Sequence, residues 1–405
     1  LLSILDPQRL SEMIEGWTNA AKEGGWFPKW SSPGYRACMI GTHLDAVVAD
    51  AFVKGCRDFD VEAAYAAMLR DATEVGNEDG SFGRAGIDAF DRLGYVPADE
   101  FEHAASRTMD HAYTDFCVAQ VARGLGRQED AARFYDRALN YRNTFDVGTG
   151  FARGRLRDGS FVEPFDEFAW GGAYIEGSAW QCTWAVPHDP AGMAELMGGR
   201  QATIAKLDRM LELPPVFDVG NYGREIHEMT EMAAVDFGQY AHSNQPVHHV
   251  LYLYTALGEP SKTQYWVRRV LNELYKPGPA DGFAGDEDNG EMTAWYIFSA
   301  LGLYPLCPGH STYVLGAPLF EKATIQPRGG EAFVIEGRGN RGSTSYAQQI
   351  ELDGRPLSRL FVEQEEITRG GTLAFEMTEE AGHRTYESAD LPFSLSRLSG
   401  GKRNR

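Results

Sequence analysis

The spacing of apolar residues changes once along this chain, near Pro305, and that change constrains the fold more than any other feature. Before Pro305, apolar residues recur at the three-to-four-residue interval of amphipathic helices, and sustained alternation is almost absent. After it, short β-branched or aromatic segments are separated by Gly, Asp and Pro turns. The pattern therefore predicts a mainly α chain that ends in a small β domain.

The helical part is expected to hold a long succession of helices. The first follows an Asp6-Pro7 cap and covers 5–21, and the others are expected near 44–55, 60–74, 105–125, 127–143, 176–184, 199–211, 225–240, 245–258, 260–274 and 290–302. Several form antiparallel pairs joined by short Gly-containing turns. So many paired helices predict an (α/α)6 toroid or barrel over residues 1–305, with one central cleft. An α-solenoid is the alternative, although no repeat signature of about 34 or 40 residues is present.

The β part is expected over residues 306–395 as a sandwich-like domain. Its strands are predicted at 312–315, 322–325, 332–336, 347–352 and 373–377. The polar residues 396–405 are expected to form a disordered tail.

The net charge of −20 disfavours two classes of partner, since nucleic acids and anionic membranes both require a basic surface. No stretch approaches the ~18 apolar residues of a membrane span. The five cysteines are scattered without the spacing of a zinc site, so buried free thiols are expected. A neutral substrate and a bound cation suit this composition.

The first candidate site is the acidic stretch Gly282–Tyr296, GFAGDEDNGEMTAWY. Asp286, Glu287 and Asp288 lie between glycines just before an aromatic-rich helix, where they are suited to act as a base, as metal ligands or as both. The alternative is an acidic surface loop that caps the helix. An EF-hand is excluded, because the sixth and twelfth positions of such a loop fall on Glu291 and Ile297 instead of Gly and Glu.

The second candidate site surrounds Glu176, which is flanked in sequence by Tyr174, Trp180 and Trp184. A carboxyl group packed among aromatic rings has a raised pKa and can serve as a general acid. The alternative is an acidic residue in the first turn of a helix. Together with the 286–288 cluster, Glu176 matches the acid and base pair of a glycosidase. Trp180 is expected in the wall of the substrate site.

The third candidate site covers 224–249. His227 and Glu228 open one helix, and Asn244 and Gln245 form a turn whose amide oxygens are plausible calcium ligands. The HEMTE sequence lacks the second histidine of a zinc-binding HExxH motif. Histidines held in the core by backbone hydrogen bonds are the expected state of His248 and His249.

A fourth set of residues suits a sugar cleft, where aromatic faces stack on rings and carboxylates bind hydroxyls. It comprises Trp26, His43 and Asp45, with Arg107 at the start of a later helix. Simple packing of the aromatic residues is the alternative.

Eight segments occur in the order of a known family. They are GWFPKWSSPG, GTHLDAVVADAFVKG, ASRTMDHAYTD, YIEGSAWQCTWAVPHD, REIHEMTEM, YAHSNQPVHH, GDEDNGEMTAWYIFSALGLYP and DGRPLSRLFVEQEEITRGGTLAFEM. From about residue 5 to 390 the chain resembles glycoside hydrolase family 92, the calcium-dependent α-mannosidases. The resemblance implies an (α/α)6 barrel with a β-sandwich before it and strands after it. It also implies inverting hydrolysis of α-mannosides, often the α-1,2 links of N-glycans or mannan.

Carried over by motif, Glu176 falls on the family's general acid, and Asp288 and Asp286 fall on its two candidate bases, with Asp288 favoured. His227 and Glu228 align with residues that hold the leaving-group sugar in α-1,2-specific members. Asn244 is the best candidate calcium ligand, with Gln245 and Asp288 as lesser ones.

Two departures from the family pattern bear on function. The family usually reads HGNEP where this chain reads HSNQP, so the neutral Gln245 replaces a carboxylate and weaker metal binding is expected. The N-terminal β-sandwich is absent from this chain and is a potential partner domain. A non-catalytic mannoside-binding chain is therefore the alternative function, and a glycosidase for another sugar is the third. The resemblance implies a secreted or periplasmic protein that acts on mannose-containing oligosaccharides.

Overall fold

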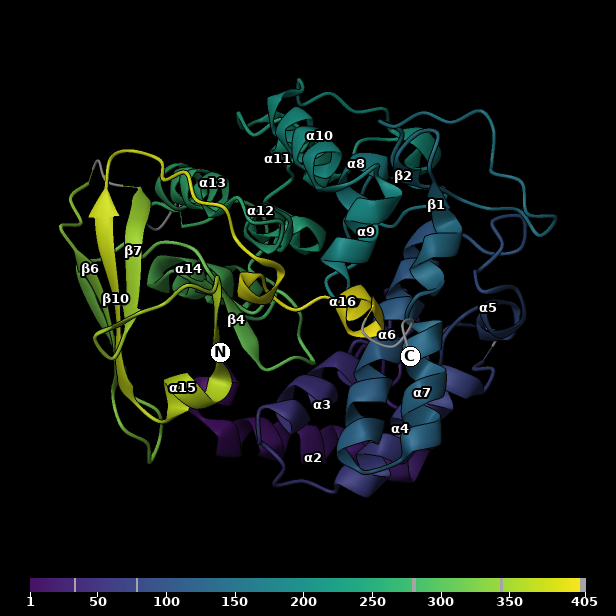
Figure 1. Ribbon diagram of the computed structural model, residues 1–405. Helices are drawn as coiled ribbons and strands as arrows, with labels where there is room; N and C mark the ends of the chain where they lie inside the picture. Colours follow the sequence, from purple (N-terminus) through teal and green to yellow (C-terminus); the bar gives the residue numbers. More distant parts are fainter. Residues whose placement is uncertain (33, 78, 279–281, 343–344, 401–405) are drawn as a thin grey trace.

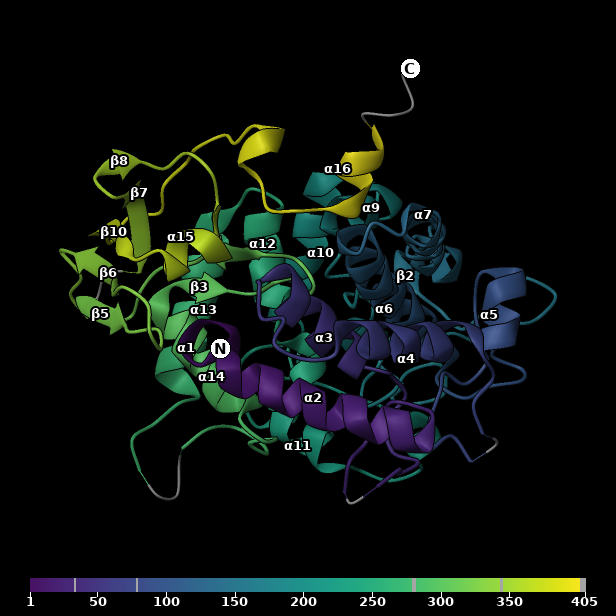
Figure 2. The same cartoon turned by 90° about the horizontal axis from the view of Figure 1, so that it is seen from below.

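The computed structural model describes residues 1–32, 34–77, 79–278, 282–342 and 345–400 (Figures 1 and 2). Helices dominate as far as Leu301, and most of the strands lie in the last quarter of the chain. Figure 1 shows the five-stranded sheet at one side of the molecule and the long helices α2 to α7 at the other. The predicted mainly α fold with C-terminal strands is confirmed.

The α-helices of the described chain are α1 (Leu2–Leu5), α2 (Pro7–Gly24), α3 (Leu44–Val53), α4 (Val61–Thr73), α5 (Ile87–Leu93), α6 (Ala104–Gly124), α7 (Gln128–Arg137), α8 (Ala179–Cys182), α9 (Pro190–Leu196), α10 (Arg200–Glu212), α11 (His227–Ala233), α12 (Leu253–Ala256), α13 (Pro260–Glu273), α14 (Glu291–Leu301), α15 (Gln364–Thr368) and α16 (Leu395–Gly400). Short 3-10 helices are η1 (Asn140–Thr144), η2 (Gly220–Tyr222), η3 (Gln245–Val247), η4 (Val250–Tyr252) and η5 (Ser388–Asp390). The helix expected at 245–258 is thus three short pieces, and those expected at 176–184 and 225–240 are much shorter.

Helix α2 forms where the sequence predicts it. Pro7 occupies its first turn, and the carboxylate of Asp6 accepts a hydrogen bond from the backbone N–H of Arg9 at 3.1 Å. The helix ends at Gly25, whose φ of 87° is a left-handed conformation that glycine adopts without steric cost.

Helix α6 passes through the middle of the helical part. Almost its whole surface is buried, because α3, α4 and α7 pack around it. Its first turns carry Ser106, Arg107 and Asp110 toward the segment that holds Glu176, since the backbone N–H of Ile175 donates to Ser106 Oγ at 3.2 Å. A buried helix therefore fixes one side of the candidate site.

The C-terminal strands form two sheets. A five-stranded sheet has the order β5 (Lys322–Ile325), β6 (Phe333–Arg338), β10 (Gly371–Thr378), β7 (Tyr346–Leu352) and β8 (Arg355–Pro356), and a three-stranded sheet has the order β3 (Leu303–Tyr304), β4 (Thr312–Leu315) and β9 (Phe361–Glu363). Only β6 and β10 pair in parallel among these strands, with Phe333 opposite Gly371. A further pair, β1 (Phe145–Asp146) and β2 (Phe151–Ala152), is antiparallel. Four of the five predicted strands begin within one residue of the prediction.

Both ends of the described chain pack onto parts distant in sequence. Ile4 of α1 is buried in the core of the β part, and Gln364 Nε2 donates to the carbonyl of Ser3 at 2.9 Å. Helix α16 lies beside α9 in both ribbon views. Residues 396–400, expected within a disordered tail, are helical because Ser396 bonds to the buried carboxylate of Asp189. Residues 401–405 lie outside the described residues.

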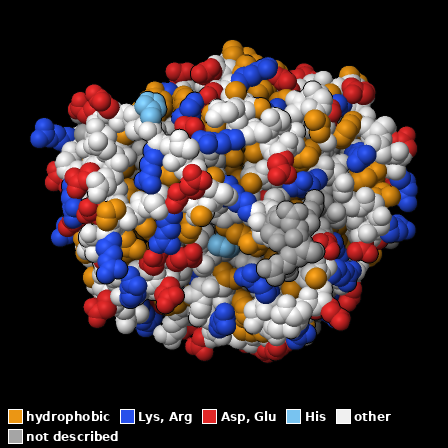
Figure 3. Space-filling view, viewed as in Figure 1, with side chains coloured by type: hydrophobic (Ala, Val, Ile, Leu, Met, Phe, Trp, Pro, Cys, Tyr) orange, Lys and Arg blue, Asp and Glu red, His pale blue; other side chains and the backbone are white. Residues whose placement is uncertain are grey.

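Charges of both signs are interspersed on the face shown in Figure 3, without a region of one sign. None of the helices in the described ranges has the length and apolar character needed to cross a membrane.

Candidate active site

Glu176 lies on a loop just before α8, in an unusual backbone conformation. Its φ of 47° places a residue with a side chain in the left-handed region. Its backbone N–H donates to the hydroxyl of Tyr222 at 2.9 Å, and Asn244 Nδ2 donates to its carbonyl at 3.2 Å and to its carboxylate at 3.4 Å. Side chains from two other segments therefore hold this residue in place. The helix expected to begin at 176 begins at Ala179, capped by Ser178.

The surroundings of Glu176 favour its protonated form. Burial has the largest effect and raises the pKa of the carboxyl group, and the hydrogen bond from Asn244 opposes that shift. The carboxylates of Glu228 and Asp288 raise the pKa further, whereas the imidazole of His227 lowers it. The net shift is upward, as a general acid requires.

The aromatic residues beside Glu176 in sequence do not form an exposed wall. Tyr174, Trp180 and Trp184 are at most 5% exposed and belong to the main hydrophobic core. Trp180 packs edge-on against Phe151 at 4.9 Å between ring centres. With 1% of its surface exposed, Trp180 cannot contact a substrate, so its predicted place in the substrate site is wrong. The loop turns its ring inward.

The three carboxylates of the acidic loop have two different roles. Glu287 caps α14, because its carboxylate accepts from the backbone N–H of Gly290 and from the hydroxyl of Thr293, the latter at 2.7 Å. Asp286 and Asp288 remain exposed. The capping interpretation of the sequence thus applies to Glu287 alone, and the other two carboxylates are available to a ligand.

Gly285 brings this loop against the segment that carries Asn244. Its φ is 77°, and a Cβ atom there would lie 2.5 Å from the carbonyl oxygen of Ser243. Only glycine allows so close an approach. The loop and Asn244 therefore reach Glu176 from the same side.

His227 and Glu228 lie at the start of α11. The imidazole of His227 is 3.2 Å from the carboxylates of both Glu228 and Glu231. Partial burial lowers the pKa of His227, but these two carboxylates and that of Asp286 raise it more, so the net shift is upward. The carboxylates of Glu228 and Asp288 raise the pKa of Glu176, and that of Asp286 raises the pKa of His227. These five predicted residues therefore form one cluster.

The other histidines of the third region are core residues, as expected. The Nε2–H of His248 donates to the carbonyl of His242 at 3.0 Å, and the Nε2–H of His249 donates to the carbonyl of Trp184 at 2.7 Å. Burial lowers the pKa of His249 to about 4, so its imidazole is neutral.

The predicted calcium ligands are Asn244, Gln245 and Asp288. Asn244 is 5% exposed. Because the carbonyl of Glu176 can only accept a hydrogen bond, the Nδ2 of Asn244 must face it. The Oδ1 of Asn244 accepts from the N–H of Gln245 at 3.1 Å. That oxygen keeps a second lone pair, and Asp288 is exposed on the adjacent loop. Oxygen donors of this kind fit a hard cation. Within the described ranges, no three His, Cys, Asp or Glu residues are grouped closely enough to hold a metal by themselves.

The fourth predicted set divides between the site and the core. His43 is exposed and lies 3.5 Å from the carboxylate of Asp110, which raises the pKa of the imidazole. Arg107, one turn earlier on α6, donates from Nε to the carbonyl of Glu102 at 2.9 Å, and its buried Nη1 has no hydrogen-bond partner among the described residues. Burial raises the pKa of the Cys182 thiol, and the carboxylates of Glu176 and Asp110 raise it further. This end of α6 therefore adjoins the carboxylate cluster.

Asp45 differs from its prediction, whereas the prediction for Trp26 is not decided by its contacts. Asp45 has no exposed surface; it accepts from Thr42 at 2.8 Å and pairs with the buried Arg84 at 2.9 Å. Its role is to join buried segments, so its assignment as a substrate ligand is wrong. Trp26 is partly buried and stacks on Phe82 at 5.1 Å. Its place in the sugar cleft stays a prediction beside the packing alternative.

One residue of the cluster, Tyr222, was not predicted. Its hydroxyl is the acceptor for the Glu176 backbone, yet it lies in a short turn, Gly220–Tyr222, 46 residues away in sequence. A tyrosine in an Asn-Tyr-Gly turn carries no signal that distinguishes it from a surface residue.

Comparisons with known proteins identify the family and the fold. Residues 1–379 match the glycosyl hydrolase family 92 catalytic domain. A family 92 inverting mannosidase of Bacteroides thetaiotaomicron is 41% identical, with a TM-score of 0.89 over 98% of this chain and 54% of that one. An α-mannosidase of the same organism, solved in complex with mannoimidazole, is 28% identical, with a TM-score of 0.85 over 100% of this chain and 54% of that one.

A curated relative is more distant. An uncharacterized secreted glycosidase of Arthroderma benhamiae is 26% identical over 92% of this chain and 50% of its own length. The fold is that of a glycoside hydrolase catalytic domain. The chain belongs to glycosyl hydrolase family 92. It spans about half the length of these relatives.

Proposed function

We propose that this chain is part of an exo-acting α-mannosidase that releases mannose by a single displacement with inversion. The observation that carries the proposal is the placement of Glu176 and Asp288 in one cluster, in which burial and neighbouring carboxylates raise the pKa of Glu176. One protonated and one ionised carboxyl group are what glycoside hydrolysis requires. The 41% identical mannosidase supports both the substrate and the stereochemical outcome.

In the proposed reaction Glu176 protonates the glycosidic oxygen as the bond to the anomeric carbon breaks. Asp288, or Asp286 in its place, removes a proton from a water molecule that attacks the opposite face of the ring. Inverting enzymes keep the two carboxyl groups about 6.5–9.5 Å apart so that this water fits between them. His227 and Glu228 would hold the leaving-group sugar, which favours α-1,2 links in N-glycans or mannan.

A calcium ion is part of the proposal. Asn244, Gln245 and Asp288 would hold it, because their oxygens are of the type that hard cations prefer. When bound, it would grip the mannose hydroxyls O2 and O3 and favour a flattened ring. The neutral Gln245 should make that binding weaker than a carboxylate would.

The proposal extends to architecture and location. We assign the helical part to an (α/α)6 barrel over residues 1–305, with 306–395 as a separate β domain. The distant secreted relative supports an extracellular or periplasmic setting. The proposed partner is a mannose-containing oligosaccharide, and a preceding β-sandwich domain would complete the cleft.

One observation favours a second function. The chain spans about half the length of its relatives. By itself it can therefore bind mannosides without hydrolysing them, and turnover would then require a second domain. Binding of a mannoside by a folded chain that hydrolyses none of it would support this alternative.

The test of the acid assignment compares two leaving groups. Glu176→Gln should lower kcat/KM by several orders of magnitude on a disaccharide, whose leaving group needs a proton, and far less on an activated aryl mannoside. Glu129→Gln, an exposed acid on α7, is the matched control and should change neither rate. Equal losses on both substrates would reject Glu176 as the acid.

A further inference from the structure

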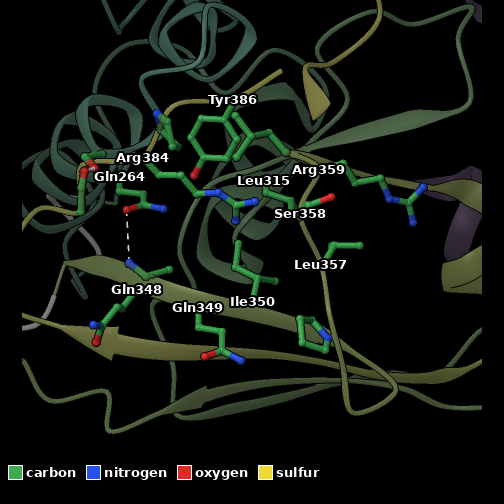
Figure 4. Close-up of a pocket in the computed structure, with 16 residues that line it drawn as sticks. Gln264, Leu315, Gln348, Gln349, Ile350, Leu357, Ser358, Arg359, Arg384 and Tyr386 are labelled. Carbon is green, nitrogen blue, oxygen red and sulfur yellow. Dashed lines mark hydrogen bonds between the residues drawn. The ribbon is translucent and has the colours of Figure 1, made fainter. Parts of the chain in front are cut away.

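A cavity of about 450 Å³ lies at the junction of α13 and the β part, apart from the carboxylate cluster (Figure 4). Its floor is apolar and includes Ile350 and Leu357, whereas Ser261, Arg384 and Tyr386 provide polar groups around it. None of its lining residues belongs to the candidate active site. Its volume is within the range of small-ligand sites, and it is large enough for a monosaccharide.

Arg384 gives this cavity an uncommitted positive charge. Its guanidinium stacks on the ring of Tyr386 at 5.1 Å, and it forms neither an ion pair nor a hydrogen bond with any described residue. Figure 4 shows the guanidinium between Tyr386 and Ile350, directed into the cavity. By contrast, Arg359 at the edge of the same cavity pairs with Glu366 at 2.5 Å. A guanidinium presents a fork of donors that fits a carboxylate or a phosphate.

The start of α13 adds a second favourable group for an anion. The positive end of a helix dipole lies at such a terminus, although Pro260 has no N–H to offer and the N–H of Lys262 already donates to the carbonyl of Glu259 at 3.1 Å. The preceding residue, Glu259, makes no side-chain cap and pairs instead with Arg200 at 2.9 Å. Ser261, in the first turn, lines the cavity and ties it to the Arg384 segment by donating to the carbonyl of Gly382 at 2.9 Å.

The acidic groups nearest to the cavity already have partners. The carboxylate of Asp390 accepts from the hydroxyl of Ser358 at 2.9 Å, and that of Glu259 is occupied by Arg200. Glu259 is therefore paired with a positive charge and Asp390 with a neutral hydroxyl group, whereas Arg384 has no ion-pair partner among the described residues. On a protein of net charge −20, Arg384 thus leaves a local positive charge at this cavity.

We propose that this cavity binds a sugar-sized ligand that carries an anionic group, either a carboxylate or a phosphate. The anionic group is held by the fork of Arg384 and faces the start of α13, while the sugar ring packs on Ile350 and Leu357. The inference does not depend on the proposed mannosidase activity, because no residue is shared between the two sites.

The test is calorimetric titration of the full chain with glucuronate and with glucose 6-phosphate. Glucose is the neutral control. Derivatives of glucose are used because the proposed active site is expected to bind mannosides instead. At least one of the two acids should bind, glucose should not, and added salt should weaken the binding. Binding of glucuronate alone identifies a carboxylate ligand, and binding of glucose 6-phosphate alone identifies a phosphate ligand.

Variants assign any binding to the cavity. Arg384→Gln should weaken it by about tenfold or more, because a charge-assisted bidentate contact is lost, and Arg384→Lys should restore only part of it. Arg92→Gln, at an exposed arginine on α5 that pairs with Asp88 at 2.9 Å, should leave the affinity unchanged. Absence of binding by both acids, equal binding of glucose, or full affinity in Arg384→Gln would overturn the proposal.

Discussion

Replacing Tyr222 with phenylalanine tests whether the backbone of Glu176 is held for catalysis. The hydroxyl of Tyr222 accepts the N–H of Glu176 at 2.9 Å, and the φ of Glu176 is 47°. A residue with a side chain pays roughly 1–2 kcal/mol in this left-handed region. Three hydrogen bonds of about 1 kcal/mol each, one to Tyr222 and two from Asn244, offset that cost.

The magnitude follows from the loss of one of these bonds. Tyr222→Phe leaves the Glu176 N–H without its acceptor, which costs about 1–2 kcal/mol at a partly buried position. Since 1.4 kcal/mol corresponds to a factor of ten, kcat/KM on a disaccharide should fall roughly 5- to 30-fold. An activated aryl mannoside should lose less, because its departure needs little help from the acid.

The assay measures kcat/KM on α-1,2-mannobiose and on 2,4-dinitrophenyl α-mannoside, with a thermal melt of each variant. Tyr95→Phe is the matched control, because its hydroxyl donates to the carbonyl of Leu156 at 2.9 Å away from the carboxylates. That variant should lose stability without a change in the ratio of the two rates. An unchanged disaccharide rate in Tyr222→Phe, or equal losses on both substrates, would refute the positioning role.

Two further predictions concern the same cluster. Burial and the carboxylates of Glu228 and Asp288 raise the pKa of Glu176, so kcat/KM should fall as the pH rises through that raised pKa. Glu228→Gln removes one negative charge and should move this alkaline limb of the pH profile to lower pH. A limb that does not move would contradict the assignment. Gly285→Ala should lower activity about tenfold or more, because a Cβ would lie 2.5 Å from the Ser243 carbonyl and displace the acidic loop, whereas Gly282→Ala meets nothing within 4 Å and should be close to wild type in the same rate assay.

The sequence predicted the secondary structure best where local chemistry decides it. Strand β4 at Thr312–Leu315 and strand β5 at Lys322–Ile325 match the predicted bounds, because short apolar runs between turn residues specify them. The predicted helix at 245–258 instead breaks into short turns. Its residues are buried almost all round, so long-range packing decided the backbone there.

The candidate site was predictable in residue type but not in geometry. Glu176, His227 and Asp288 were singled out by their composition and context, and the structure brings them together. Asp45 was misassigned because its partner Arg84 is 39 residues away and only the folded chain shows the pair. The orientation of Trp180 likewise depends on which face of a four-residue helix turns inward, and four residues show no periodicity.

The most direct test of the central claim is the anomer that the chain releases from α-1,2-mannobiose, followed by NMR with and without EDTA. Inversion with a bound calcium ion predicts β-mannose as the first product, a loss of the reaction in EDTA and its return with Ca²⁺. Release of α-mannose would contradict inversion by Glu176 and Asp288, and mannobiose binding without any release would establish the non-catalytic alternative.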